Sequence, residues 1–547
     1  MKTNSRKSNF ILQGGILGIA GILTRIIGMI YRIPVTNIIG PEGNGYYAAA
    51  YQVYTVMLLI SSYSLPLAVS RLVSARFSRG EYKNADRLFK SALAFAFATG
   101  GGVCILLWFG ADFFAVRLMS EPMSAIALKI FAPTLLIVAL MGVIRGYFQG
   151  MGTMVPTAVS QIIEQIINAI VSILAAGWLV EYGKKVGALL RNESYAAAYG
   201  AAGSTLGTSM GALMGLVFLL VMLMYVNADI RSHVRKDKEK SPEGYRSLMY
   251  MLVMTVIPVI MSTAIYNVSE LISNSMFNKI MIAKGFESTK SYIWGVYSGE
   301  YKILLNVPIA LSNAMSASVV PALTACMASR DIKGARRRVS QAMRFTMIIA
   351  FPCMVGLFVL ADPIMHMLFK DGYEMAATMM KIGCINIILY SASTLSNGML
   401  QGLGKMNVPV RNACISLIAH IGILYLLLTR TEFGIYSVIG ANFCFALLMS
   451  LLNHTAIRRL IKYRQEKLRT FIIPAISAVI MGAVAAFINL LLNKTAGDVV
   501  SVVAAMAIGA LVYGLVLIRL GGISSREIES LPMGKKIAYL LRIIGVL

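Results

Sequence analysis

Fourteen long apolar segments constrain this chain more than any other feature of its sequence. A helix needs about 20 predominantly apolar residues to cross a bilayer, and each segment reaches that length. The chain is 57% hydrophobic and 14% charged, with a mean hydropathy of +0.72, which is typical of a polytopic membrane protein. The predicted fold is therefore all-α with fourteen transmembrane helices. The predicted spans are 9–39, 45–76, 86–116, 124–149, 156–181, 197–228, 248–283, 292–328, 336–361, 373–401, 407–429, 435–463, 469–492 and 498–520.

The distribution of lysine and arginine predicts which helix ends face the cytoplasm. A net charge of +26 would suggest a nucleic-acid partner in a soluble protein, but here it is concentrated at the amino terminus, in alternate loops and in the tail. Cytoplasmic loops carry such an excess. We therefore expect a multi-pass membrane protein with both termini inside, no nucleic-acid partner and a surface for anionic lipids. The loop at 181–196 departs from the pattern, because it carries basic residues on the predicted outer side.

The sequence repeats at an offset of about 250 residues. Gly45 in the second helix recurs as Gly295 in the eighth, and the loop motif at 149–154 recurs at 401–406. Six helices per copy give both copies the same orientation, so we predict two parallel six-helix lobes and an extra C-terminal helix pair. The predicted divisions are an N-terminal lobe at 1–228, a basic cytoplasmic linker at 229–247, a C-terminal lobe at 248–467, and the extra pair with an amphipathic cytoplasmic tail at 468–547.

The first apolar segment carries a polar stripe that requires an explanation. Arg25 and Arg32 share one helical face with four glycines, because all six recur at steps of three and four. Glycine permits close approach to a backbone, and a charge at bilayer depth normally faces a bundle interior or a water-filled cavity. The stripe indicates either a cationic cavity for an anionic substrate or arginines that snorkel to the interface or pair with a buried acid. The glycines are Gly14, Gly18, Gly21 and Gly28.

Charges also lie inside later predicted helices, where ionisable residues mark candidate functional sites. Arg145 in the fourth helix and Glu164 in the fifth both lie near the predicted cytoplasmic side. They form a structural ion pair in the simpler interpretation and serve substrate binding or gating in the other. Glu270 lies deep in the seventh helix, where an unpaired carboxylate would be costly, so Arg25 or Arg32 is its expected partner.

We expect cationic and polar side chains from both predicted lobes to hold the substrate. Lys302 and Asn306 share a face of the eighth helix, whereas Glu300 points elsewhere on that helix. The expected gating or ion-pair residues are Glu164 and Glu300. The expected substrate-binding residues are Arg25, Arg32, Arg145, Lys302, Glu270 and Asn306.

The sequence shows no catalytic, cofactor or metal motif. The segment 402–405 resembles a phosphate loop only superficially, because Met406 stands where Ser or Thr is required and no strand precedes it. The four histidines are scattered, and the six cysteines lie in apolar stretches without a CxxC pair. The predicted outer loops are too short for a glycosyltransferase or hydrolase site. We therefore expect a transporter and not an enzyme, with no cofactor.

The first two helices resemble a known family. Thr24-Arg25-Ile26-Ile27-Gly28, Tyr31-Arg32-Ile33-Pro34 and Gly43-Asn44-Gly45-Tyr46-Tyr47 are similar to the opening of the SpoVB/YtgP branch of the MurJ-like lipid II flippases. These belong to the multidrug/oligosaccharidyl-lipid/polysaccharide exporter superfamily. The resemblance extends to the tail, and it maps the family's first arginine motif onto Arg25. It implies a cavity between the lobes for a pyrophosphate-sugar head, and a groove on the last two helices for a polyprenyl tail.

The resemblance implies a flippase that moves a polyprenyl-pyrophosphate-linked cell-wall precursor by alternating access, with lipid II as the first candidate. It implies a role in peptidoglycan or polysaccharide biosynthesis, cell shape or sporulation, with cell-wall synthesis proteins as further candidate partners. One alternative is a flippase for another lipid-linked glycan, such as a capsule or teichoic unit. Another is a multidrug/cation antiporter of the same superfamily, against which the arginine stripe and the extra helix pair argue. A membrane glycosyltransferase would need loops and carboxylates that this sequence lacks.

Overall fold

The structure is a computed structural model that describes the backbone of residues 2–237 and 243–523. Side chains are described over the same ranges except at 2–16, 19, 229, 233, 257–267 and 494–496. The predicted tail beyond residue 523 and the centre of the predicted linker therefore lie outside the described residues. Within the described residues every regular element is a helix, and many of these helices are of membrane-spanning length, which confirms the all-α polytopic fold.

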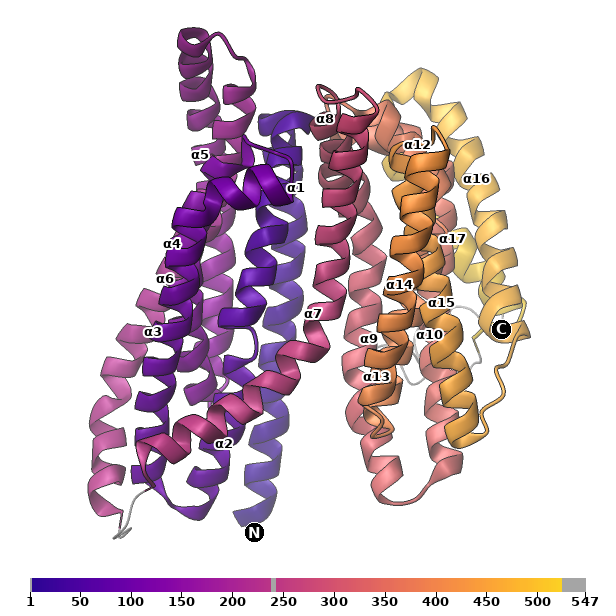
Figure 1. The fold of residues 1–547 in the computed structure, drawn as a ribbon. Coiled ribbons are helices and arrows are strands. Elements are labelled where there is room, and N and C mark those ends of the chain that lie inside the picture. The colour runs from indigo at the N-terminus through magenta and orange to yellow at the C-terminus, as the bar shows by residue number, and fades with distance from the viewer. Residues whose placement is uncertain (1, 238–242, 524–547) are drawn as a thin grey trace. The chain divides into compact units, whose positions relative to one another are not determined.

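The chain divides into two compact units, Met1–Gly299 and Glu300–Leu547. The boundary lies inside a π-helix, η2 (Tyr297–Tyr301), within one candidate span. The predicted lobes at 1–228 and 248–467 follow the repeat instead of this division, and they stay a prediction. Unit 1 (Figure 1) contains α1 (Lys2–Ser61), α2 (Leu65–Arg79), α3 (Tyr82–Phe113), η1 (Phe114–Leu118), α4 (Ser124–Gly150), α5 (Val155–Leu190), α6 (Ser194–Lys236), α7 (Tyr245–Ala283) and α8 (Lys290–Val296).

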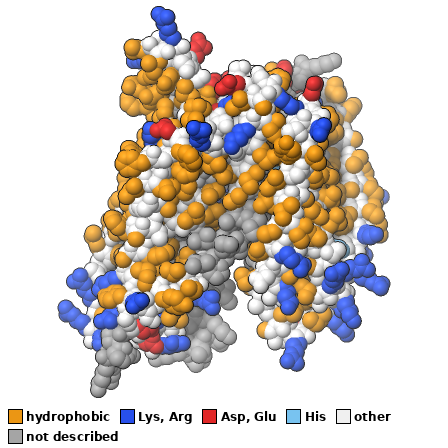
Figure 2. Space-filling view, viewed as in Figure 1, with side chains coloured by type: hydrophobic (Ala, Val, Ile, Leu, Met, Phe, Trp, Pro, Cys, Tyr) orange, Lys and Arg blue, Asp and Glu red, His pale blue; other side chains and the backbone are white. Residues whose placement is uncertain are grey.

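Unit 2 contains the remaining helices, and its last two are the predicted extra pair. Its helices are α9 (Lys302–Ala328), α10 (Ile332–Val359), α11 (Ala361–Leu368), α12 (Tyr373–Gly383), α13 (Asn386–Gly402), α14 (Asn407–Arg430), α15 (Ile435–Ile461), η3 (Leu468–Ile472), α16 (Ile473–Ala496) and α17 (Asp498–Arg519). On the face that Figure 2 shows, apolar side chains cover the middle of each unit, and Lys and Arg gather toward the helix ends. This pattern is expected where helices cross an apolar layer.

Eleven described helices are long and apolar enough to cross a membrane, and a twelfth span is the pair α12 and α13, which meet at a bend of 58°. The count of fourteen stays a prediction. The predicted span at 45–76 and most of the one at 9–39 lie within Ala20–Arg79, which counts as one helix of 60 residues. Sixty helical residues would extend roughly 90 Å, about three times the hydrocarbon thickness of a bilayer. The predicted span at 248–283 contains residues whose side chains are not described.

Helix α1 breaks at Gly40, between the first two predicted spans. The φ of Gly40 is 68°, a left-handed value that glycine adopts without strain, and the following Pro41 has no N–H to donate to the helical ladder. The buried Asn44 side chain compensates, because its Nδ2 donates to the carbonyl oxygens of Gly40 at 2.9 Å and Thr36 at 3.4 Å. The break therefore separates the arginine stripe from the tyrosine-rich half of α1.

Glycines of the repeated loop motif make equivalent contacts in both units. A Cβ on Gly150 of α4 would lie 2.6 Å from the Val73 Cβ of α2. A Cβ on Gly402 of α13 would lie 2.9 Å from the Leu323 Cβ of α9. Both the glycines and their partners are separated by about 250 residues, the offset of the sequence repeat. The same small-residue helix contact thus occurs in each copy.

A buried ion pair, which the sequence analysis did not predict, joins two connections of unit 1. The Nζ of Lys290 lies 2.8 Å from Oε1 of Glu121, and these side chains are only 5% and 3% exposed. The Ser291 hydroxyl donates to the same carboxylate at 2.8 Å. Burial raises the pKa of the Glu121 carboxyl, and the Lys290 ammonium opposes that shift. The pair holds the start of α8 against the connection between η1 and α4.

We expect Lys290→Met to destabilise the protein by roughly 3–5 kcal/mol, because Glu121 would lose the cation that compensates its burial. Without Lys290, the pKa of Glu121 in the folded state lies further above its unfolded value, so stability should fall as the pH rises above that unfolded value. The double variant Lys290→Met, Glu121→Gln should regain most of the stability and lose the pH dependence. Thermal unfolding at about pH 5 and about pH 8 measures both effects. Equal unfolding temperatures of the single variant at the two pH values would contradict the prediction.

The predicted orientation can be tested at two exposed residues, Ser288 and Ser329, at opposite ends of the span Lys290–Ala328. Asn44 lies in a predicted outer loop but is fully buried, so a cysteine there would react poorly from either side. In a variant without the six native cysteines, Ser288→Cys should react with an impermeant thiol reagent in intact cells. Ser329→Cys should react only after permeabilisation. The reverse pattern would overturn the predicted topology.

Candidate functional site

Arg25 lies in an exposed part of α1, and its guanidinium makes no ion pair or hydrogen bond with a described residue. The glycine face beside it is open, because a Cβ on Gly18 or Gly21 would meet nothing within 4 Å. The stripe closes one turn further on, where a Cβ on Gly28 would lie 3.1 Å from Nε2 of Gln165 in α5. The side-chain position of Gly14 is outside the described residues. The geometry leaves room for a ligand around Arg25.

Arg32 is half-buried and lies over an aromatic ring. Its guanidinium carbon is 3.8 Å from the ring centroid of Tyr47, and Tyr47 stacks on Tyr51 with centroids 5.6 Å apart. This cation–π contact orients the guanidinium plane without neutralising its charge. A stacked guanidinium keeps a planar fork of N–H donors, which suits a phosphate or carboxylate.

The described ion pairs do not include the predicted pair of Glu270 with Arg25 or Arg32. Its Oε1 accepts a hydrogen bond from Nε2 of Gln52 in α1, at 3.3 Å. The Gln52 Oε1 in turn accepts from Nδ2 of Asn274, one turn beyond Glu270 in α7, at 2.7 Å. A neutral amide therefore helps to orient this carboxylate.

The contact between Gln52 and Asn274 begins a buried amide ladder that the sequence analysis missed. Asn278 donates from Nδ2 to Oδ1 of Asn274 at 3.1 Å and to the Met119 carbonyl at 2.9 Å, and both asparagines are fully buried. The signal was present in the sequence, because a polar residue recurs every four positions from Glu270. The ladder ties α7 to α1 and to the end of η1.

Arg145 and Glu164 form the ion pair that the simpler interpretation of the sequence predicts. Nη2 of Arg145 lies 2.7 Å from Oε2 of Glu164, and Arg145 Nε donates to the Ser160 hydroxyl at 3.0 Å. These charged side chains are 13% and 27% exposed, so the pair is largely removed from solvent. Glu164 thus compensates the charge of Arg145, and a further role of either residue in binding or gating stays a prediction.

A polar stripe on α5 was also missed. Its residues recur at steps of one, three and four on an otherwise apolar helix, which is the sequence signal for a polar face inside a bundle. Asn168 donates from Nδ2 to the Tyr31 hydroxyl of α1 at 3.1 Å, and the Ser172 hydroxyl donates to Oδ1 of Asn168 at 2.9 Å. The stripe therefore faces the arginine-bearing half of α1. Its members are Gln161, Glu164, Gln165, Asn168 and Ser172.

The remaining predicted residues belong to unit 2. Lys302 is half-buried and Asn306 is exposed, both near the start of α9. Glu300 is only 1% exposed, and its Oε2 has no hydrogen-bond partner among the described residues. No described residue forms the ion pair that was expected as one role of Glu300. A joint site of Lys302 and Asn306 with the arginines of unit 1 stays a prediction.

Comparisons with known proteins place the chain in a family. The family Polysacc_synt, described as polysaccharide biosynthesis protein, matches residues 12–327, which is more than half of the chain. This chain belongs to the polysaccharide biosynthesis protein family. A second family, MatE, matches residues 301–426.

Two curated relatives extend this result. The chain is 25% identical to Stage V sporulation protein B of Bacillus subtilis (strain 168), over 96% of this chain and 98% of the relative. It is 26% identical to Lipid II flippase MurJ of the same organism, over 75% of this chain and 76% of the relative. These matches confirm the resemblance to the SpoVB branch of the MurJ-like flippases that the first two helices show.

Two solved structures share the fold. An inward closed conformation of Lipid II flippase MurJ aligns with a TM-score of 0.63 at 14% identity, and covers 91% of this chain and 97% of that one. An inward-facing MATE family multidrug transporter of the MOP superfamily aligns with a TM-score of 0.64 at 13% identity, and covers 80% and 96%. At these identities the likeness shows the fold of a polytopic membrane transporter.

The variant Arg145→Met should destabilise the protein by roughly 3 kcal/mol, because Glu164 would remain as a largely buried carboxylate without its cation. The double variant Arg145→Met, Glu164→Leu should regain most of that loss. As a matched control, Lys129→Met breaks an exposed ion pair with Asp112 and should cost under about 1 kcal/mol. Thermal unfolding of the purified proteins measures all three.

Transport by the double variant then separates the two interpretations of this pair. A stable variant that still transports substrate would show a structural role only. A stable variant that no longer transports would assign Arg145 or Glu164 to binding or gating. An equal loss of stability in Arg145→Met and Lys129→Met would contradict the burial argument itself.

Proposed function

We propose that this protein flips a polyprenyl-pyrophosphate-linked cell-wall precursor across the bacterial cytoplasmic membrane by alternating access, with lipid II as the first candidate substrate. Membership of the MurJ-like and SpoVB branch supports a lipid-linked precursor as the transported class. The flippase and transporter names of the relatives support transport, not catalysis. The identity of the glycan belongs to the proposal.

The observation that carries this proposal is the guanidinium of Arg25, which is unpaired among the described residues and lies on an open glycine face. A charge at bilayer depth is costly, so an arginine without a protein partner favours an anionic ligand. A pyrophosphate can accept two parallel N–H bonds from one guanidinium. Arg32, which lies over the Tyr47 ring, offers a second fork on the same helical face.

The other predicted residues take secondary roles in this proposal. Glu164 already compensates Arg145, so Arg145 is available to the substrate only if that pair opens. Glu270 offsets the positive stripe in the empty carrier, and the substrate's own charge replaces it in the loaded carrier. Lys302 and Asn306 contribute further hydrogen-bond donors to the sugar and peptide head.

Charge movement provides a source of energy for this cycle. No nucleotide-binding motif was found in the sequence, so the driving force must come from the membrane potential, an ion gradient or substrate supply. Moving one elementary charge across the membrane is worth about 2.3 kcal/mol per 100 mV. The net charge of the site with its load therefore decides how strongly the potential drives each step.

Arg25→Ala should abolish flipping while the protein still inserts and folds, because Arg25 forms no ion pair with a described residue that the substitution would break. Arg25→Lys should restore only part of the activity, since lysine offers a point charge and not a two-pronged fork. Flipping of defined lipid-linked sugars in liposomes and complementation of a flippase-depleted strain measure the effect. Arg117→Ala removes an equal charge from an exposed site in η1 and should leave flipping unchanged.

A double neutral variant provides the outcome that would refute substrate binding by Arg25. If Arg25 served only to balance Glu270, the variant Arg25→Ala, Glu270→Ala should flip substrate normally. If Arg25 binds the pyrophosphate, the double variant should be present in the membrane at normal levels but should not flip substrate. Active flipping by the double variant would therefore refute substrate binding by Arg25.

A second candidate substrate is another lipid-linked polysaccharide unit. The match to Stage V sporulation protein B over nearly the full length of both chains favours this candidate. The same liposome assay with lipid II and with other polyprenyl-pyrophosphate-linked glycans separates the two candidates. Faster flipping of a glycan other than lipid II would replace lipid II as the substrate and leave the flippase mechanism unchanged.

A further inference from the structure

An apolar groove lies in unit 2, beside the segment that connects α15 to the extra helix pair. Its volume is about 490 Å³, within the range of ligand-binding pockets. Side chains of α10, α13, α15 and η3 form it, so it is distinct from the face between the last two helices. Its apolar lining includes Met343, Ile388, Met399, Leu447, Leu451 and Phe471.

Polar and basic side chains line the groove mainly where residues 463–467 cross it. Gln465 and Lys467 of this segment and His454 of α15 are among the lining residues. Lys467 is exposed, and its ammonium forms no ion pair with a described residue. Residues 458–469 carry six basic side chains and one acidic one, Glu466, which pairs with Arg469 at 3.7 Å. The groove therefore combines an apolar interior with a cationic rim.

Local interactions hold this segment over the groove. Helix α15 ends at Ile461, and its C-cap residue Lys462 has a left-handed φ of 51°. Nε of Arg336 in α10 donates to the Ile461 carbonyl at 2.5 Å, and the Tyr463 ring that follows is buried in the core. The chain therefore runs back across the helices, and Lys467 comes to lie at the groove.

We propose that this groove binds an acyl chain of an anionic phospholipid from the predicted cytoplasmic leaflet, with the lipid phosphate at Lys467. Leu451, which lines the groove, and Leu468, which follows Lys467 in the chain, are 53% and 57% exposed on candidate spans, as expected for side chains that face lipid. The basic surplus complements the negative surface of that leaflet. An acyl chain has no polar atoms to satisfy, so it matches the apolar lining of α13 and α15.

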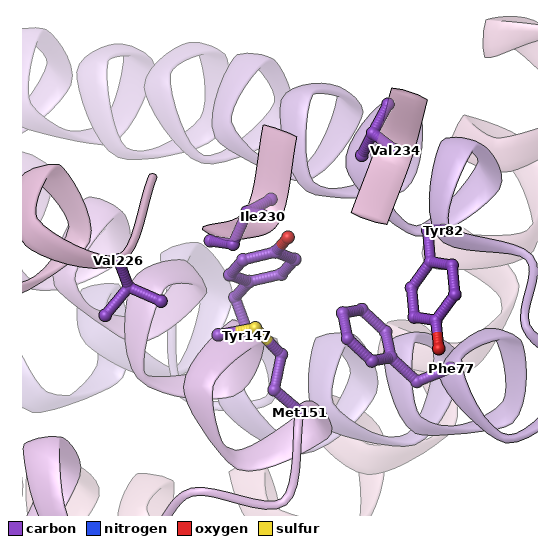
Figure 3. A pocket seen from close by; sticks show the side chains of 7 residues that line it. All are labelled: Phe77, Tyr82, Tyr147, Met151, Val226, Ile230 and Val234. Carbon is purple, nitrogen blue, oxygen red and sulfur yellow. The ribbon is translucent and has the colours of Figure 1, made fainter. Parts of the chain in front are cut away.

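Unit 1 contains a smaller apolar pocket in the other copy of the repeat. Figure 3 shows Phe77, Tyr82 and Tyr147 around a cavity of about 270 Å³, which α2, α3, α4 and α6 form. Tyr147 in this pocket and Met399 in the groove occupy equivalent positions of the repeat. None of the described residues that line the unit 1 pocket is charged. This pocket is therefore an internal control for apolar binding without a phosphate anchor.

Native mass spectrometry of the delipidated full-length protein, titrated with phosphatidylglycerol or phosphatidylcholine, tests the proposal. The wild type should bind phosphatidylglycerol more tightly than phosphatidylcholine. Lys467→Glu should weaken phosphatidylglycerol binding roughly tenfold, because it reverses the charge at the phosphate. Lys462→Glu makes the same charge change in the same stretch of chain at a residue that does not itself line the groove, and should have a much smaller effect.

Two further variants test the apolar part of the site. Leu451→Trp, at the exposed groove wall, should weaken binding of phosphatidylglycerol, whereas Ile230→Trp in the unit 1 pocket should not. Equal weakening of phosphatidylglycerol binding by Lys467→Glu and Lys462→Glu would contradict a discrete site. It would indicate instead that the basic surface attracts anionic lipid without a defined binding position. Displacement of phosphatidylglycerol by a polyprenyl phosphate at lower concentration would assign the groove to the substrate tail and overturn the proposal. Because Lys467 is exposed, we expect Lys467→Glu to fold, so that weaker lipid binding by this variant can be assigned to the changed charge.

Discussion

The contact between α1 and α8 is possible only because glycine occupies both sides of it. A Cβ on Gly295 would overlap the carbonyl oxygen of Pro41, and a Cβ on Gly45 would overlap the carbonyl oxygen of Ser291. Backbone atoms cannot move aside as a flexible side chain can, so any larger residue would force the helices apart. The break in α1 and the buried ion pair of unit 1 both lie beside this contact. One close approach therefore sets where the arginine half of α1 ends and where the next span begins.

Three arginines of unit 1 show how environment assigns different roles to one residue type. Glu164 compensates Arg145, the ring of Tyr47 supports Arg32, and Arg25 has no described partner. All three occupy membrane-length helices, so membership of an apolar span does not distinguish them. The difference lies in the neighbour of each side chain. Arg145 contacts an acid on α5, Arg32 contacts an aromatic ring on α1, and Arg25 lies beside an open glycine face. The charge available to an anionic ligand therefore concentrates on α1.

Periodic patterns made the helices, the basic loops and the arginine stripe predictable, because each depends on residues near one another in sequence. Arg145 and Glu164 could be paired in advance since they lie near the same end of consecutive helices. The ion pair of Glu121 with Lys290 could not, because about 170 residues separate them and neither lies in a repeated pattern. The bend between α12 and α13 follows Gly383, and the buried Tyr301 side chain packs against that glycine, a contact that only the tertiary structure shows.

The two copies of the repeat differ in how they satisfy their polar interiors. Asn397 precedes Gln401 by the same four residues that separate Arg145 from Gln149. Asn397 accepts a hydrogen bond from Asn453 at 2.6 Å, in a network of uncharged amides, where Arg145 pairs with a carboxylate. Neutral amides cost less to bury than ions, so the fold can fill this position without charge. The same position therefore holds an ion pair in one copy and a neutral amide in the other, and this asymmetry gives the Arg145 and Glu164 variants their diagnostic value.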